Sequence, residues 1–159
     1  MSVTDELLPN NSQYAESFEK GDLPPARGVV ACMDARLEVH KILGLGEVDT
    51  HVIRNAGGVI TDDEIRSPAI SQRLLGTREI ILIHHTDCEM LTFSDDELKQ
   101  QIQEDVGIKP HFSMESFSVL EVDVRQSIAR IQASPFVPHK DSVRGFVYEV
   151  ETGRLREVT

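Results

Sequence analysis

The chain has 159 residues, of which 16 are basic and 27 are acidic, for a formal net charge of −11. Hydrophobic residues make up 40% of the sequence and there are 10 glycines besides, as in an ordinary soluble domain with a core of its own. This is the usual size of one domain, so we expect residues 1–159 to form a single domain. The acidic balance argues against nucleic acid and anionic membranes as partners, because both are bound chiefly through Lys and Arg.

The first residues do not have the pattern of a targeting segment. Asp5 and Glu6 stand where a signal peptide would carry positive charge, and no apolar stretch approaches the roughly 20 residues that span a bilayer. We therefore expect a cytoplasmic protein whose thiols stay reduced. Its two cysteines, Cys32 and Cys88, are then buried core residues, metal ligands or nucleophiles rather than a disulfide.

Short segments rich in β-branched residues alternate with helical patterns along the chain. Strands are predicted at residues 27–33, 50–54, 79–85 and 143–150, and the third is largely apolar, as in a strand buried on both faces. A tight turn at residues 151–153 predicts a hairpin with residues 154–158. The alternation predicts an α/β fold with a mostly parallel central sheet of order 2-1-3-4, an antiparallel edge strand and helices on both faces.

Helix starts are marked by capping boxes, in which Ser or Thr is followed three residues later by Glu. Three such pairs occur in the sequence: Thr61 with Glu64, Ser94 with Glu97, and Ser118 with Glu121. The corresponding helices are expected to end at Gly76, at Gly107 and before Pro135. Pro68 predicts a kink or a restart within the first of them.

Residues 10–20 predict a short helix before the first strand. Asn11 or Ser12 can cap it, and Tyr14, Ala15 and Phe18 share one of its faces. The residues alone favour a helix packed on its own domain. Docking onto a second subunit is the alternative.

Chemically active side chains gather where the first and third predicted strands end. Cys32 and Asp34 point to the same side of the first strand if the backbone stays extended, and His85 and Cys88 follow at the end of the third. In a sheet of order 2-1-3-4 these strands are neighbours whose carboxyl ends border a crevice, so we expect these groups to converge. Two thiolates and an imidazole suit Zn²⁺, and three protein ligands leave the fourth position for water, as in catalytic zinc sites.

Other readings of these residues stay open. Each cysteine by itself is more often a core residue than a ligand, and a nucleophilic Cys with a His base is a further alternative. Asp34 is the local competitor for the fourth zinc position, from which Arg36 can hold it away in a bidentate pair. Asp87 can hydrogen-bond to the site, whereas His84 is expected to be packed or hydrogen-bonded elsewhere.

These residues, in this order, resemble the β-class carbonic anhydrases, particularly the short bacterial form. The matching motifs are Cys32-Met-Asp34-Ala-Arg36, Arg54-Asn-Ala-Gly57-Gly58 and His85-Thr-Asp-Cys88. The resemblance implies that Cys32, His85 and Cys88 bind Zn²⁺, with Asp34 as a further ligand in a closed state only. It also implies that Asp34 and Arg36 form the acid–base dyad.

The resemblance has further implications for substrate and assembly. It implies a pocket for CO2 and bicarbonate lined by Asn55, Gly57 and Gly58. It implies a homodimer or a dimer of dimers, in which residues 1–25 form a helical arm that docks on a partner subunit. This reverses the preference for an arm packed on its own domain.

The function that follows is zinc-dependent reversible hydration of CO2 to bicarbonate and a proton, by attack of zinc-bound hydroxide. Two alternatives keep the same zinc site: a hydrolase of carbonyl sulfide or carbon disulfide, and a zinc-binding module without catalysis. No residue separates the three substrates. Asp34 and Arg36 argue against the module, because a structural site has no need of such a pair.

Overall fold

The computed structural model describes residues 3–18, 27–46 and 48–159. Its helices and strands, in chain order, are α1 (Val3–Glu16), β1 (Arg27–Cys32), α2 (Val39–Leu43), β2 (Thr50–Asn55), η1 (Ala56–Gly58), α3 (Asp62–Leu75), β3 (Glu79–His85), η2 (Glu89–Leu91), α4 (Asp95–Val106), α5 (Leu120–Ala133), β4 (Val143–Glu149) and β5 (Arg154–Val158). All five strands lie within two residues of the segments predicted for them. In the described part of the chain no helix is long and apolar enough to cross a membrane.

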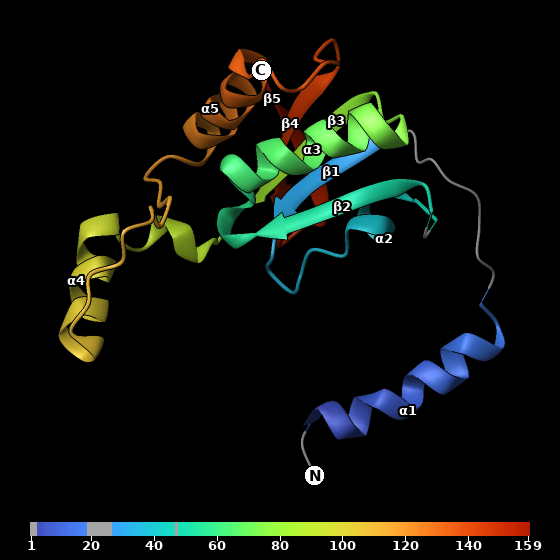
Figure 1. Ribbon diagram of the computed structural model, residues 1–159, viewed down its shortest axis with the longest axis horizontal. Coiled ribbons are helices and arrows are strands. Elements are labelled where there is room, and N and C mark those ends of the chain that lie inside the picture. The colour runs from blue at the N-terminus through green and yellow to red at the C-terminus, as the bar shows by residue number, and fades with distance from the viewer. Residues whose placement is uncertain (1–2, 19–26, 47) are drawn as a thin grey trace.

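One sheet organises the molecule, with strand order β2-β1-β3-β4-β5 (Figure 1). β1 pairs in parallel with both β2 and β3, and β3 pairs in parallel with β4. β5 runs antiparallel to β4 at the edge, after the tight turn. The predicted order 2-1-3-4 with an antiparallel edge strand is confirmed.

The two faces of the sheet carry separate cores, because successive side chains of a strand point to opposite sides. Val29 and Ile83 belong to a core that α2 covers. Val30, Leu82 and their neighbours form a second core, against which α3 and α5 pack. Helices therefore lie on both faces, as predicted, and the central strands β1 and β3 are buried between them (Figure 1).

Two of the three predicted helix starts are confirmed. Capping boxes of Thr61 with Glu64 and of Ser94 with Glu97 open α3 and α4, which end at left-handed Gly76 and Gly107. The helix does not restart at Pro68, since α3 continues through it as one helix. Pro68 is buried, so packing of its ring against the domain offsets the hydrogen bond that its missing N–H cannot make.

The predicted cap at Ser118 is also wrong. α5 begins one residue later, with Val119 at the N-cap and no side chain capping it. The backbone N–H of Phe117 donates to the carbonyl of Met90 at 3.2 Å, which ties the chain to η2 just before the helix. That tertiary bond, rather than the local capping pattern, determines where the chain can turn into the helix.

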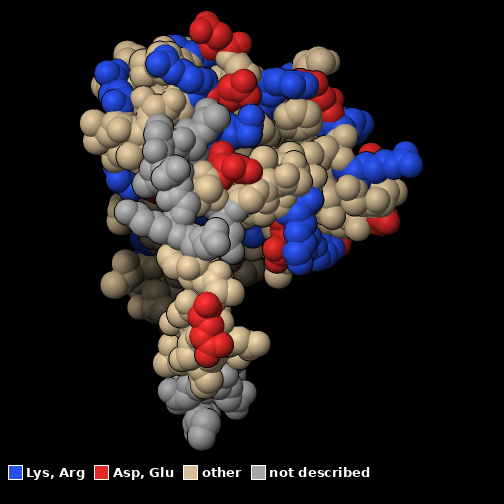
Figure 2. Space-filling model, turned by 90° about the vertical axis from the view of Figure 1, so that its right-hand side faces the viewer, with Lys and Arg blue, Asp and Glu red and all other residues tan. Residues whose placement is uncertain are grey.

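The N-terminal helix is longer than predicted. α1 begins at Val3 and runs through Asn11 and Ser12, the residues expected to cap it. It lies apart from the sheet and projects from the rest of the molecule (Figure 1 and Figure 2). Leu7 and Leu8 are 59% and 62% exposed on it. The remainder of the expected arm, residues 19–25, lies outside the described residues.

Asp95, the first residue of α4, ties the loop that follows this helix back to its start. Its carboxylate accepts hydrogen bonds from the N–H groups of Met114 and Ser116 and from the hydroxyls of Ser113 and Ser116, at 2.8–3.0 Å. Partial burial raises the pKa of Asp95, but these hydrogen bonds outweigh it and hold the pKa well below its usual range. The ionised carboxylate therefore stabilises this loop.

We predict that Asp95→Asn lowers the free energy of unfolding by about 1–2 kcal/mol at pH 7, because a charged acceptor of several hydrogen bonds is lost. The folded pKa is depressed, so the stabilisation is present above the unfolded pKa of about 3.9 and is lost as the pH falls through the folded value. The difference in the free energy of unfolding between parent and variant should therefore become smaller below about pH 4. Urea unfolding followed by circular dichroism at several pH values measures it.

Asp96→Asn is the matched control. Asp96 is exposed in the same first turn of α4 and accepts no hydrogen bond from the described residues, so its variant should change stability little at any pH. An equal loss in both variants would mean that the helix terminus, and not the loop, accounts for the effect.

Candidate metal centre

Three ligand-type side chains meet at the carboxyl ends of β1 and β3. Cys32 is the last residue of β1, His85 is the last residue of β3, and Cys88 lies just before η2. One ligand atom of each lies within 4.8 Å of those of the other two, and all three residues are buried. The convergence expected from the predicted strand order is confirmed.

His85 presents an unpaired nitrogen to this group. Its Nδ1 lies 2.7 Å from the carbonyl oxygen of Thr86 and, because a carbonyl can only accept, Nδ1 carries the proton. When the ring is neutral, Nε2 carries the lone pair, and this atom is buried without a hydrogen-bond partner among the described residues. A bare imidazole nitrogen beside two thiols is the donor set that a thiophilic metal ion takes up, so the residues fit a metal centre.

The two thiols ionise unequally. The Cys88 thiol lowers the pKa of Cys32, and the His85 side chain and the backbone N–H groups of Asp34 and Gly57 lower it further against the effect of burial. In turn, interaction with the Cys32 thiolate, together with burial, raises the pKa of Cys88. A second thiolate in this space therefore requires a further positive charge, which a bound metal ion would supply.

Asp34 and Arg36 form a close pair beside the three ligand-type side chains. Arg36 donates from Nε to Asp34 Oδ1 at 3.0 Å and from Nη2 to Oδ2 at 2.8 Å, and its backbone N–H also reaches Oδ1 at 2.8 Å. The guanidinium holds the pKa of the Asp34 carboxyl well below its usual range. Oδ2 lies 3.8 Å from Nε2 of His85, so the ionised carboxylate borders the metal-ligand group.

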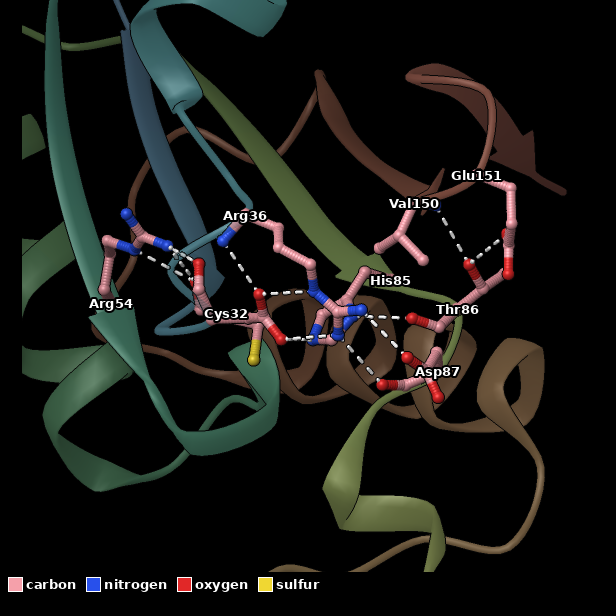
Figure 3. Close-up of polar contacts among 9 residues, drawn as sticks. Cys32, Arg36, Arg54, His85, Thr86, Asp87, Val150 and Glu151 are labelled. Atoms are coloured by element: carbon pink, nitrogen blue, oxygen red, sulfur yellow. Dashed lines mark hydrogen bonds and ion pairs between the residues drawn. The ribbon is translucent and has the colours of Figure 1, made fainter.

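Arg54 supports the same loop from β2, a contact that the sequence analysis did not identify. Its Nε and Nη2 donate to the carbonyl of Cys32 at 3.0 and 2.8 Å (Figure 3). Nη2 also donates to the carbonyl of Asp34 at 2.6 Å. These bonds fix the backbone between the two residues. The only signal in the sequence is that Arg54 opens the second quoted motif, which does not say where its side chain points.

The segment after β2 closes the site by close packing. A Cβ on Gly58 would lie 2.8 Å from the backbone nitrogen of Cys32 and 2.9 Å from the carbonyl oxygen of Ile83, so only Gly fits there. Gly57 packs under Met90 and its φ is +87°. Asn55 donates from Nδ2 to the carbonyl of Val59 at 2.8 Å and thereby holds the turn together.

His84 lies on the other side of β3. Its Nε2 is 2.7 Å from Oδ2 of Asp123 on α5, its ring contacts Phe117, and it is fully buried. The expectation of a packed, hydrogen-bonded His84 is confirmed.

The chain is similar to known carbonic anhydrases and to carbon disulfide hydrolases. The family model for carbonic anhydrase matches residues 28–155. Beta-carbonic anhydrase 1 of Mycobacterium tuberculosis is 60% identical over 163 residues, which cover 100% of this chain and 99% of the relative. Carbon disulfide hydrolase of Saccharolobus solfataricus is 34% identical over 180 residues, which cover 96% of this chain and 87% of the relative.

Among solved structures, the carbonic anhydrase of Streptococcus mutans superposes with a TM-score of 0.92 and 40% identity, covering 100% of this chain and 99% of that one. The match extends through the whole chain and includes the strand ends that carry Cys32, His85 and Cys88. The chain belongs to the carbonic anhydrase family and, within it, to the β class.

Proposed function

We propose that the protein is a zinc-dependent carbonic anhydrase that catalyses the reversible hydration of CO2 to bicarbonate and a proton. The observation that carries the proposal is the buried group of Cys32, His85 and Cys88 with its unpaired Nε2, next to the ionised Asp34. The 60% identity to a beta-carbonic anhydrase over the full chain supports the same reaction.

Each side chain then has a separate task. Cys32, His85 and Cys88 would hold Zn²⁺, and the bound ion would lower the pKa of a coordinated water molecule and so supply the nucleophile. Because two thiolates cancel the formal charge of Zn²⁺, a nearby acceptor contributes more here than in a site with neutral ligands. Asp34, kept ionised by Arg36, is positioned to accept a hydrogen bond from the attacking water and to orient it.

A second candidate substrate is carbon disulfide, which the 34% identity to a carbon disulfide hydrolase favours. Both molecules are small, linear and attacked at carbon. Stopped-flow CO2 hydration and sulfide release from carbon disulfide, measured on one zinc-loaded preparation, separate the two. We expect hydration far above the buffer rate and little sulfide. The buffer rate for both substrates, with stoichiometric zinc present, would leave only a non-catalytic zinc module.

We predict that Cys32→Ala abolishes both zinc retention and CO2 hydration, since a buried thiolate ligand is removed. Metal analysis after gel filtration measures the first and stopped-flow the second. Retention of stoichiometric zinc with parental turnover would show that Cys32 is not a ligand.

Arg36→Ala should lower kcat by about 100-fold or more while zinc stays bound, because Asp34 loses the hydrogen bonds that orient its carboxylate. Stopped-flow rates, with zinc content followed in parallel, measure this. Arg144→Ala is the matched control, because Arg144 forms an exposed pair with Glu157 near the start of β4, away from the carboxyl ends of the strands, and should leave the rate unchanged. Parental turnover in Arg36→Ala would contradict the role of the dyad.

We propose that two copies assemble through α1. Leu7 and Leu8 are exposed on a helix that projects from its own domain, and an apolar groove of about 640 Å³ lies along α3 and Phe136. A second copy would cover both surfaces, and two such dimers could associate further. We also propose a cytoplasmic location, where both thiols stay reduced and able to bind metal.

Replacing Leu7 and Leu8 by Asp together should convert a dimer of twice 17.8 kDa into a monomer, because charges cannot be buried in an apolar interface. Light scattering coupled to gel filtration gives the mass. Asn10→Asp, an exposed change on the same helix, serves as control. A double variant that keeps the mass of the parent would show that α1 does not form the interface.

A further inference from the structure

Arg36 joins two loops that are far apart in the sequence. One edge of its guanidinium donates to Asp34, as described above, and the other edge faces Asp87 in the turn between His85 and Cys88 (Figure 3). Nη1 donates to Oδ2 of Asp87 at 2.8 Å, and Nη2 donates to the carbonyl oxygen of Asp87 at 3.1 Å. Four of the five N–H groups of the guanidinium thus donate hydrogen bonds, two to Asp34 and two to Asp87.

The pair with Asp34 cannot by itself fix the position of Arg36. Arg36 is 47% exposed, and an exposed ion pair contributes little because the long side chain loses rotamer freedom and water competes for it. Asp34 sits only two residues away on the same loop, so the guanidinium and the carboxylate can move together while they stay bonded. A contact with a second, independent loop removes this freedom.

Asp87 makes that contact through an uncommon backbone conformation. Its φ is +56°, in the left-handed region, which Asp and Asn tolerate better than most residues. In this conformation both its carboxylate and its carbonyl face Arg36. Because Asp87 lies between His85 and Cys88, Arg36 is anchored to the turn that carries two of the three ligand-type side chains.

The anchoring of Arg36 matters because Asp34 lies close to the metal-ligand group. Its Oδ2 is 3.8 Å from Nε2 of His85, so a small swing of the carboxylate would place it among the ligands instead of beside them. Arg36 holds both carboxylate oxygens, and whatever holds Arg36 therefore holds Asp34 at its distance from the metal-ligand group.

We propose that Asp87 is a positioning residue, which clamps Arg36 from the opposite loop and thereby keeps Asp34 oriented beside the metal centre and out of its ligand set. This inference rests on the proposed function. The side-chain carboxylate of Asp87 accepts the hydrogen bond from Arg36, and the left-handed backbone conformation directs that carboxylate toward Arg36.

Two variants separate the side-chain contact from the backbone conformation. Asp87→Asn tolerates φ of +56° and keeps an oxygen that can accept from Nη1. Asp87→Gly tolerates the same backbone without strain but removes the acceptor. If the clamp is correct, Asn preserves kcat within about twofold, whereas Gly lowers kcat roughly tenfold with KM little changed, as expected from a misplaced reacting group.

Glu89→Gln is the matched control. It removes another exposed carboxylate close by in the chain, whose partner is Thr92 and not Arg36, and we expect it to leave kcat unchanged. Zinc content is measured for every variant first. Should Asp87→Gly bind less than one zinc per chain, its kcat is calculated per bound zinc and compared with the parent on that basis.

A second measurement needs no turnover. In zinc-loaded protein labelled with ¹⁵N-arginine, the Nη1–H signal of Arg36, which reports the bond to Asp87 and is assigned with Arg36→Lys, should exchange slowly with water in the parent and in Asp87→Asn. It should exchange quickly in Asp87→Gly. Parental kcat in the Gly variant, or a fall in kcat with an unchanged Arg36 signal, would overturn the proposal. A parent that does not hydrate CO2 would instead refute the proposed function, and the signal would still test the clamp.

Discussion

Parallel pairing of β1 with β3 is the constraint on which the rest of the site depends. The pairing places Ala31 opposite Ile83, so both strands run out at the same edge of the sheet and deliver Cys32 and His85 to one place. Gly58 allows the segment after β2 to press against this edge, since no Cβ fits between the Cys32 nitrogen and the Ile83 carbonyl. Three strand ends, rather than one long loop, therefore build the centre.

Charge is balanced locally in a protein that is strongly acidic as a whole. Hydrogen bonds, first of all from the Cys88 thiol, lower the pKa of Cys32, and its thiolate together with burial raises the pKa of Cys88, so the two thiols do not both ionise without a further cation. Arg36 and Arg54 bring positive charge to this edge, but both contact the loop around Asp34 and not the sulfur atoms. No Lys or Arg side chain among the described residues hydrogen-bonds to the sulfur atoms, and the pair of Asp34 and Arg36 forms beside the three ligand-type side chains.

Local patterns failed where tertiary contacts competed with them. Ser118 carries a valid capping sequence, yet the bond between Phe117 and Met90 moves the start of α5 past it. Pro68 should interrupt a helix, yet α3 continues because the residue is buried against the domain. Ser94 succeeded as a cap because its helix has no buried residue, so little tertiary packing competes with the local signal there.

The sequence by itself determined the strand order and the three ligand-type residues. Buried parallel strands have a strong apolar pattern in the sequence. Because the strands are parallel, their carboxyl ends lie at the same edge of the sheet. Only the tertiary structure decided which nitrogen of His85 carries the proton, the hydrogen bond from Arg54 to the Cys32 carbonyl and the hydrogen bond from Arg36 to Asp87. Spacing along a chain says which loop carries a side chain. Only the folded backbone, including the positive φ of Asp87, sets the direction in which that side chain points.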